Sequence, residues 1–411
     1  MNRVIVNIVL ILLAINITSC RKPVESQNHQ LILNEKGQKL VTQSNNFGID
    51  IFKKVYLAEE EYDNIMVSPY SISMALGMTL NGANGETEDA MKATLGFSTL
   101  EMESINQNYK TIMTHLLSVD QKVKLGIANS IWQRQDFSVI ENFTNINKEY
   151  FNAETTSLDF LDPTSVDIIN NWCAEKTEDK ITKVMDEISP EAVMFLINAI
   201  YFKGDWKYQF DEESVITGPF SQDDGTQLSV DMMTQEATLN YYDNELMQMI
   251  ELPYGNEKFT MVVMLPKSGH NLNGLMEELN SNTFNQWMGN LQRQDQVIVT
   301  LPRFKFDYKK RLNEMLIDMG MGIAFNPGLA DFSGISTAMG LFISFVDHFT
   351  FIDVNTQGTE AAAVTVVGIE LTSAGEGNVS FTADHPFVFA ITEKETNTIL
   401  FIGTVTKPEY E

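Results

Sequence analysis

The chain has 411 residues, of which 44% are hydrophobic and 20% charged, with 24 glycines and 11 prolines. This composition is typical of a globular protein and excludes a disordered, collagen-like or coiled-coil chain. With 55 acidic and 28 basic side chains the net charge is −27, so we expect no nucleic-acid partner, because the protein would repel a phosphate backbone. Two cysteines are too few for a disulfide framework.

The N-terminus is typical of an export signal. The apolar run from Val4 to Ile15 is too short for a spanning helix but suits the core of a signal peptide. Ile17-Thr18-Ser19-Cys20 then resembles a bacterial lipobox, in which a peptidase cuts before the cysteine and the cysteine carries the lipid. The resemblance implies a signal peptide over residues 1–19 and a lipoprotein anchored through Cys20 at the bacterial cell envelope or surface. Plain secretion with a chance cysteine remains the alternative.

A polar segment follows the cysteine. Residues 20–43 lack an apolar period and are predicted to be a tether to a folded body over 44–411. In that body Phe47, Ile51, Phe52 and Val55 recur at helical spacing and predict a helix over 46–56. Ser68 is typical of a helix cap and Pro69 of a first helical position, and they predict a helix through Leu80.

The rest of the body is predicted to consist mainly of strands. The remaining Cys173, beside Trp172, is expected to be a small buried apolar residue. Asp223-Asp224-Gly225 is expected to be a turn. Apolar runs predict strands over 193–201, 247–252, 259–265 and 297–306, and a last hairpin from 387–392 and 399–405. No repeat and no linker divides the body, so we expect one large α+β domain.

Motifs of catalysis or metal binding are absent from the sequence. It contains no H-E-x-x-H, C-x-x-C, phosphate-binding loop or G-x-S-x-G elbow. The five histidines are scattered without metal-ligand spacing. We therefore expect neither an enzyme, nor a cofactor, nor a bound metal.

The segment after Val354 suits two conformations. As a strand, one face would carry the small or β-branched residues Thr359, Ala361, Ala363, Thr365 and Val367, and the other would carry Glu360. Gly358 precedes this stretch like a hinge, and a polar, glycine-containing stretch follows it. The segment could be an exposed loop or an inserted strand, or simply an alanine-rich strand or short helix.

The hinge sequence Gly358-Thr359-Glu360-Ala361-Ala362-Ala363-Val364 resembles the reactive-loop hinge of serpins. Further segments resemble that family in the same order, over about residues 45–408: 64–80, 198–206, 301–304, 330–335 and 384–389. The resemblance implies the serpin fold, a single domain whose main mixed sheet accepts the reactive loop, at about 355–380, as an extra strand.

The resemblance also implies a suicide inhibitor of an endopeptidase. The protease forms an acyl-enzyme on the loop, which then inserts as a strand of about fifteen residues, about 50 Å long, and carries the trapped protease with it. In inhibitory members the scissile bond usually follows the residue fourteen positions after the hinge glycine, which is Thr372 here, with Ser373 after the cut. Glu370 and Leu371 precede it.

These residues point to classes of target. Thr372 favours elastase-like serine proteases, and Leu371 suits papain-like cysteine proteases, which read the preceding residue. A bond one residue earlier would favour chymotrypsin- or subtilisin-like enzymes. No Lys or Arg lies between Val354 and Asp384, so trypsin-like targets are not expected.

The resemblance further implies a polar sheet-opening cluster of Ser68, Ser71, Asn198 and His348. Thr356, Gln357 and Val364 depart from the family's usual hinge, without adding bulk or charge to the inserting face. We expect a monomer, and no glycosaminoglycan partner because residues 86–110 are mainly acidic. The rival function is a non-inhibitory serpin-fold binding or carrier protein, whose inserting face tends to carry charged or bulky residues.

Overall fold

The structure is a computed structural model, which describes residues 31–59, 64–338, 340–359 and 379–410. The chain divides into two units, Met1–Leu31 and Ile32–Glu411, and every helix and strand described below belongs to the second. The predicted signal peptide and Cys20 lie outside the described residues. Within the described ranges, no helix is both long enough and apolar enough to span a membrane.

The helices of the described residues are α1 (Glu35–Leu57), α2 (Pro69–Leu80), α3 (Gly85–Thr94), α4 (Met102–Leu116), α5 (Glu141–Phe151), α6 (Thr164–Lys176), α7 (Leu272–Glu278), α8 (Ser281–Asn290) and α9 (Asn313–Leu316), with the short turns η1 (Glu212–Ser214), η2 (Ile317–Met321) and η3 (Gly322–Phe325). The strands are β1 (Ile65–Val67), β2 (Val123–Arg134), β3 (Glu154–Leu158), β4 (Met194–Asp205), β5 (Ile216–Ser221), β6 (Gln227–Asp243), β7 (Met247–Pro253), β8 (Phe259–Pro266), β9 (Gln292–Pro302), β10 (Phe304–Arg311), β11 (Asp347–Val354), β12 (Gly358–Thr359), β13 (Ser380–Thr382), β14 (Phe387–Glu393) and β15 (Thr398–Val405).

Helix α1 begins earlier than the sequence pattern predicts. Asn34 caps it by accepting a hydrogen bond from the backbone N–H of Gly37, and Leu40 and Val41 are buried. The predicted tether therefore extends too far, since residues 35–43 are helical and pack in the folded body. Two apolar residues among polar neighbours were too weak a signal to reveal this packing.

The other local predictions agree with the structure except at one strand. Helix α2 begins at Pro69, with Ser68 as its cap, and ends at Leu80 as predicted. The run 297–306 is divided between β9 and β10, because Pro302 ends β9 and Arg303 turns away, its N–H donating to the carbonyl of Asp231 (2.8 Å). The two halves belong to different sheets.

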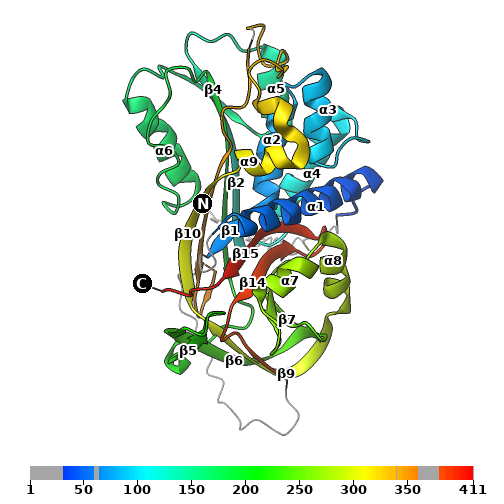
Figure 1. Ribbon diagram of the computed structural model, residues 1–411, viewed down its shortest axis with the longest axis vertical. Helices are drawn as coiled ribbons and strands as arrows, with labels where there is room; N and C mark the ends of the chain where they lie inside the picture. Colours follow the sequence, from blue (N-terminus) through cyan, green and yellow to red (C-terminus); the bar gives the residue numbers. More distant parts are fainter. Residues whose placement is uncertain (1–30, 60–63, 339, 360–378, 411) are drawn as a thin grey trace, which may run out of the picture. The chain divides into compact units, whose positions relative to one another are not determined.

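Two sheets organise the fold (Figure 1). A nine-stranded sheet has the order β1-β15-β14-β8-β7-β6-β9-β13, with β5 paired to β6. A six-stranded sheet has the order β10-β11-β12-β4-β2-β3. In it β4 and β2 are antiparallel, as are β10 and β11, while β2 and β3 are parallel.

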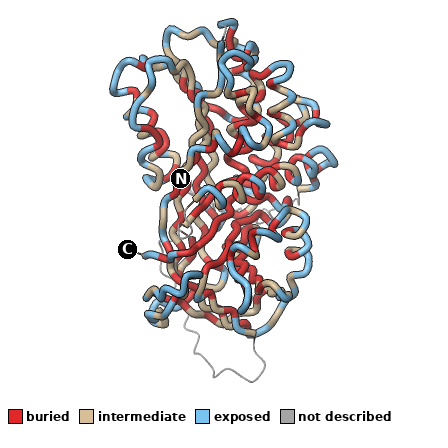
Figure 2. The backbone as a smooth tube through the Cα atoms, in the orientation of Figure 1, coloured by how far each residue is buried: buried red, intermediate tan, exposed pale blue. Residues whose placement is uncertain are grey.

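The six-stranded sheet is covered on both faces. On one face α6 buries Trp172 against Trp132 of β2, with ring centroids 6.0 Å apart. Cys173 lies in the same cluster, where burial raises the pKa of its thiol to about 12, so it is the inert apolar residue that was predicted. On the other face Asn129 of β2 contacts Met74 of α2. Buried residues follow the strands and the inner helix faces (Figure 2).

Candidate functional site

The site is a gap in the six-stranded sheet between β4 and β11. Strand β12, which is two residues long, lies between them: Gly358 pairs with Asp205 of β4, and Thr359 pairs with Gly204 of β4 and Val354 of β11. Strands β4 and β11 have twelve and eight residues. Among the described residues, no strand separates or pairs with the remaining length of their facing edges. The sheet could therefore take more chain along the line that β12 begins.

Thr359 occupies the entrance of this gap. Its side chain is 3% exposed, so it faces the interior, where the alternation places it. Its hydroxyl lies 2.5 Å from the hydroxyl of Tyr254, which is itself fully buried. Burial raises the pKa of Tyr254, so the phenol stays protonated. Tyr254 in turn stacks on Trp206, with centroids 4.4 Å apart.

Gly358 fits only because it has no side chain. A Cβ atom at this position would lie 2.1 Å from the carbonyl oxygen of Gly204 and 2.8 Å from the Cα of Asp205. Both are backbone atoms of β4, so a larger residue would push β12 away from that strand. The close approach of two backbones thus explains a glycine at the start of the predicted hinge.

Residues 355–357, which precede the predicted hinge, are held by hydrogen bonds to Trp206 and Glu212. Trp206 donates from its indole to the carbonyl of Asn355 (2.9 Å) and from its backbone N–H to the carbonyl of Gln357 (2.8 Å). The hydroxyl of Thr356, 3% exposed, donates to Glu212 (2.6 Å). Arg303 pairs with the same carboxylate, and Arg303 and then Thr356 hold the pKa of Glu212 below its ordinary value. The departure at Thr356 is therefore accommodated by a partly buried hydrogen bond.

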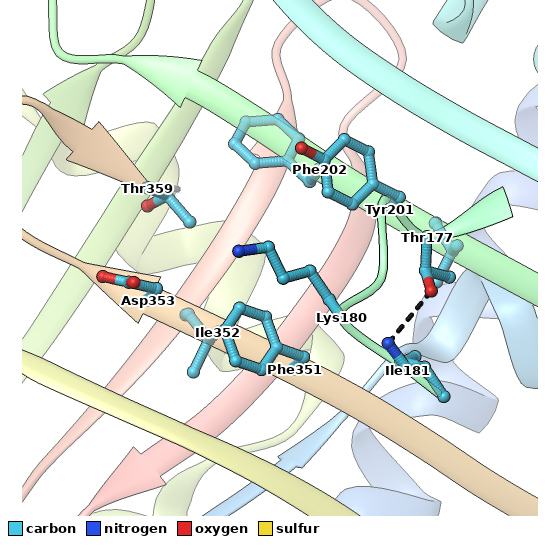
Figure 3. Close-up of a pocket in the computed structure, with 10 residues that line it drawn as sticks. Thr177, Lys180, Ile181, Tyr201, Phe202, Phe351, Ile352, Asp353 and Thr359 are labelled. Carbon is cyan, nitrogen blue, oxygen red and sulfur yellow. Dashed lines mark hydrogen bonds between the residues drawn. The ribbon is translucent and has the colours of Figure 1, made fainter. Parts of the chain in front are cut away.

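Directly beyond Thr359, a small pocket occupies the gap (Figure 3). Tyr201 of β4 and Phe351 of β11 line its two sides. Lys180, in the segment after α6, extends into it, with its ammonium 5.3 Å from the centroid of the Phe351 ring. That segment is held by Thr177, whose hydroxyl accepts from the N–H of Ile181 (3.0 Å). Chain added after Thr359 would have to displace Lys180.

The chain leaves one sheet at Thr359 and rejoins the other at Ser380. There β13 pairs in parallel with β9, Ser380 opposite Ile298. The remaining hinge residues, Glu360 to Val364, and the predicted reactive-bond residues, Glu370, Leu371, Thr372 and Ser373, lie outside the described residues. The segment 360–378 thus connects two fixed points in different sheets.

Three residues of the predicted sheet-opening cluster lie in one network. The backbone N–H of Ser68 donates to Nε2 of His348 (2.9 Å). The hydroxyl of Ser68 donates to the carbonyl of Leu400 (2.6 Å) and accepts from the N–H of Ser71 (3.3 Å). Burial lowers the pKa of His348 to about 3, so the imidazole is neutral and can accept.

The fourth member, Asn198, lies in a neighbouring pair. Its amide donates to the amide oxygen of Asn129 (2.7 Å), directly opposite on β2, and approaches the sulfur of Met74 (3.5 Å). Asn129 also donates to the carbonyl of Phe151 (2.7 Å). Sequence reasoning missed Asn129 and Tyr254, because a single polar residue in an apolar run shows neither its partner nor its sheet position.

Comparison with known proteins adds independent information. The family model described as "Serpin (serine protease inhibitor)" matches residues 42–408. An uncharacterized serpin-like protein of Methanosarcina acetivorans is 34% identical over 376 residues, which is 90% of this chain and 87% of that protein. The native-state crystal structure of Tengpin, a thermophilic serpin, is 34% identical with a TM-score of 0.83, covering 92% of this chain and 96% of that one. Human thyroxine-binding globulin in complex with thyroxine is 27% identical with a TM-score of 0.83, covering 91% and 100%.

Proposed function

The chain belongs to the serpin family, whose members are generally protease inhibitors, and from this we propose that it inhibits an endopeptidase as a suicide substrate. The observation that carries the proposal is β12, a two-residue strand in the gap between β4 and β11 whose chain continues into the predicted reactive loop. In the first step, the protease nucleophile attacks the carbonyl carbon of Thr372. The bond to Ser373 breaks, the nitrogen of Ser373 takes up the proton that the nucleophile gave up and leaves as an amine, and the carbonyl of Thr372 stays covalently bonded to the protease nucleophile.

Insertion would follow from the register already present. Because β12 is antiparallel to both neighbours, its continuation would place Ala361 opposite Phe202 of β4 and Ile352 of β11. In the same register Thr365 would lie between Asn198 and His348, the two strand residues of the predicted cluster. The inward-facing residues of the loop are small or β-branched and would fit there, and each added residue would complete backbone hydrogen bonds with both edges.

The predicted loop sequence suggests the class of target. Thr372 would suit the small primary pocket of elastase-like serine proteases, and Leu371 would suit papain-like cysteine proteases. The experiment mixes the protein with a panel of both classes and looks for complexes that survive SDS, with mass spectrometry of the released peptide to place the cut. Cleavage without any complex, for every protease, would refute inhibition.

A matched variant tests the position of the bond. No Lys or Arg lies between Val354 and Asp384, so Thr372→Arg introduces the only trypsin site of that segment. We expect the variant, unlike the parent, to form an SDS-stable complex with trypsin. If trypsin only cleaves it, while Leu371→Arg or Ser373→Arg forms the complex, the bond is misplaced by one residue.

A second candidate is a non-inhibitory binding protein, favoured by the likeness to thyroxine-binding globulin. The two functions differ after cleavage of the loop. In an inhibitor, insertion of the cleaved loop should raise the melting temperature of the protein and trap the protease. The function of a binding protein requires neither the rise in melting temperature nor the trapped protease. We keep inhibition first, because the inserting face carries no charged or bulky residue.

We also propose that the protein is an exported monomer, anchored through a lipid on Cys20. The support is the lipobox-like sequence before Cys20 and the apolar run that precedes it. Fractionation of cells expressing the parent and Cys20→Ala tests the anchor: the parent should be in the membrane fraction and the variant should be released. If the parent and the variant distribute equally between the membrane and soluble fractions, Cys20 does not carry a lipid anchor. Size-exclusion chromatography of the released variant tests the monomer.

A further inference from the structure

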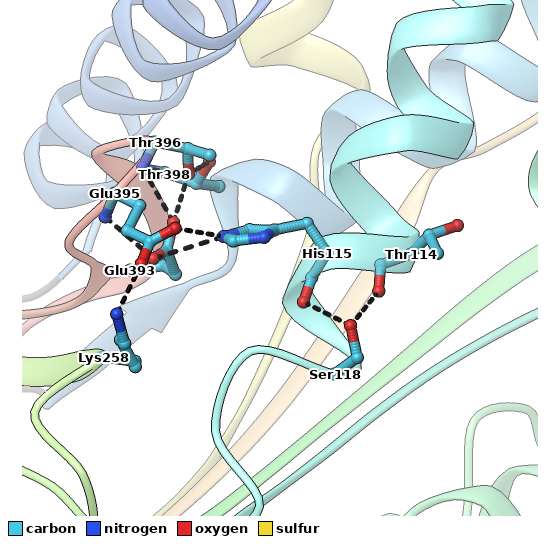
Figure 4. A network of polar contacts seen from close by, with 8 residues as sticks. All are labelled: Thr114, His115, Ser118, Lys258, Glu393, Glu395, Thr396 and Thr398. Atoms are coloured by element: carbon cyan, nitrogen blue, oxygen red, sulfur yellow. Dashed lines mark hydrogen bonds and ion pairs between the residues drawn. The ribbon is translucent and has the colours of Figure 1, made fainter. Parts of the chain in front are cut away.

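A cluster of His115, Glu393 and Glu395, in which Glu393 is buried and the other two are partly buried, lies away from the predicted hinge (Figure 4). His115 is in the last turn of α4, and both glutamates are at the turn between β14 and β15. Their side chains are 9%, 0% and 12% exposed, and one ligand atom from each lies within 4.8 Å of the others. His115 is far from both glutamates in sequence, so their spacing does not reveal the cluster.

Glu393 is held in a fixed orientation. One carboxylate oxygen accepts from the backbone N–H of Glu395 (2.8 Å), and the other accepts from the N–H and hydroxyl of Thr396 (2.8 and 2.6 Å). A buried carboxylate whose two oxygens are oriented by backbone and hydroxyl donors is a preorganised ligand for a cation.

His115 lies within ion-pair distance of both carboxylates but makes no hydrogen bond to either. Its Nε2 is buried and makes no hydrogen bond, and it lies 3.5 Å from Glu393 and 3.7 Å from Glu395. A charge-assisted hydrogen bond would be roughly 2.7–2.9 Å long. By contrast, atoms that share a tetrahedral ion with bonds of about 2.1 Å lie about 3.4 Å apart. The two separations from Nε2 therefore suit an ion between the imidazole and the carboxylates better than a direct pair.

The ligand set also favours a cation. One imidazole and two carboxylates converge here, and the ammonium of Lys258 lies 2.5 Å from Glu395. One imidazole and two carboxylates form a ligand set for zinc or a similar transition-metal ion, with a water completing the tetrahedron. We propose that His115, Glu393 and Glu395 bind one divalent transition-metal ion, which ties α4 to the turn between β14 and β15.

The experiment uses the full mature chain, freed of metal with EDTA, and ZnCl2 as the probe. Isothermal titration should show that the parent binds one zinc ion more than His115→Ala. At one hundred times the dissociation constant, zinc should raise the melting temperature of the parent by about 3 °C and leave that of the variant unchanged. His270→Ala, which removes an exposed histidine, is the matched control and should behave like the parent.

A conservative variant covers the case in which His115→Ala does not fold. Glu395→Gln keeps the size of the side chain, and it should weaken zinc binding at least tenfold. Equal zinc binding by the parent and both variants would place the ion elsewhere and overturn the proposal. The proposal also fails if the parent binds no zinc, since the three residues would then form only an ion pair.

Discussion

Replacing Thr359 with arginine is expected to convert the protein from an inhibitor into a substrate. Thr359 is 3% exposed between Gly204 and Val354, so a guanidinium there would be buried in the sheet without a partner. The change would also remove the hydroxyl that Tyr254 contacts at 2.5 Å. The protease would still cleave the predicted reactive loop, but insertion of the loop would have to overcome this cost.

The magnitude follows from the burial. An unpaired buried charge costs at least ~3 kcal/mol even after relaxation, and the orphaned Tyr254 hydroxyl adds about 1 kcal/mol. Because each 1.4 kcal/mol of barrier is about tenfold in rate, a cost of about 4 kcal/mol should slow insertion by roughly a thousandfold. Deacylation would then win the competition, and most cleaved molecules would release an active protease.

The assay counts inhibitor molecules consumed per protease inactivated, with cleaved product followed on a gel. Parent protein should inactivate its target at about one to one, and the variant should require tens of molecules or more, following the rate ratio above. Glu360→Arg is the control, because the alternation of a strand places Glu360 on the opposite face. A Thr359→Arg variant that still traps its protease near one to one would refute the hinge assignment. Equal loss of inhibition in both variants would refute the prediction that Thr359 and Glu360 lie on opposite faces of the strand.

Three other perturbations test the contacts around the gap. Gly358→Ala would place a Cβ 2.1 Å from the carbonyl oxygen of Gly204, and we expect the second-order rate of inhibition to fall about tenfold; an unchanged rate would show that β12 can shift freely. Tyr254→Phe removes the partner of the Thr359 hydroxyl, so the amide of Thr359 should exchange its hydrogen about fivefold faster, for a loss of about 1 kcal/mol; unchanged exchange would contradict that bond. Because burial lowers the pKa of His348 to about 3, only the unfolded chain takes up its proton as the pH falls from about 6.5 toward 3, so the free energy of unfolding should drop by about 2 kcal/mol between pH 7 and 5. Urea titration of His348→Gln should lack that part of the drop, and an equal drop would assign it to other groups.

Much of the local structure could be predicted because its causes are local. Ser68 and Pro69 define the start of α2 through a cap and a fixed dihedral angle, both set by adjacent residues. The hairpin of β14 and β15 follows from two apolar runs around a polar turn. The alternation of residues after Gly358 predicted that Thr359 would be buried, as it is, and the resemblance to serpins predicted a hinge that starts at Gly358.

Other contacts join residues that are distant in the chain, and only the tertiary structure reveals them. Tyr254 and Thr359 are 105 positions apart, and only the sheet brings their hydroxyls together. The run 297–306, predicted as one strand, is divided at Arg303, because its first part pairs in one sheet and its second part pairs in the other. His115 and Glu393 form a cluster only when α4 packs beside the last hairpin. A sequence pattern records which face of an element is apolar, but the identity of the partner across a contact is set by how the elements pack.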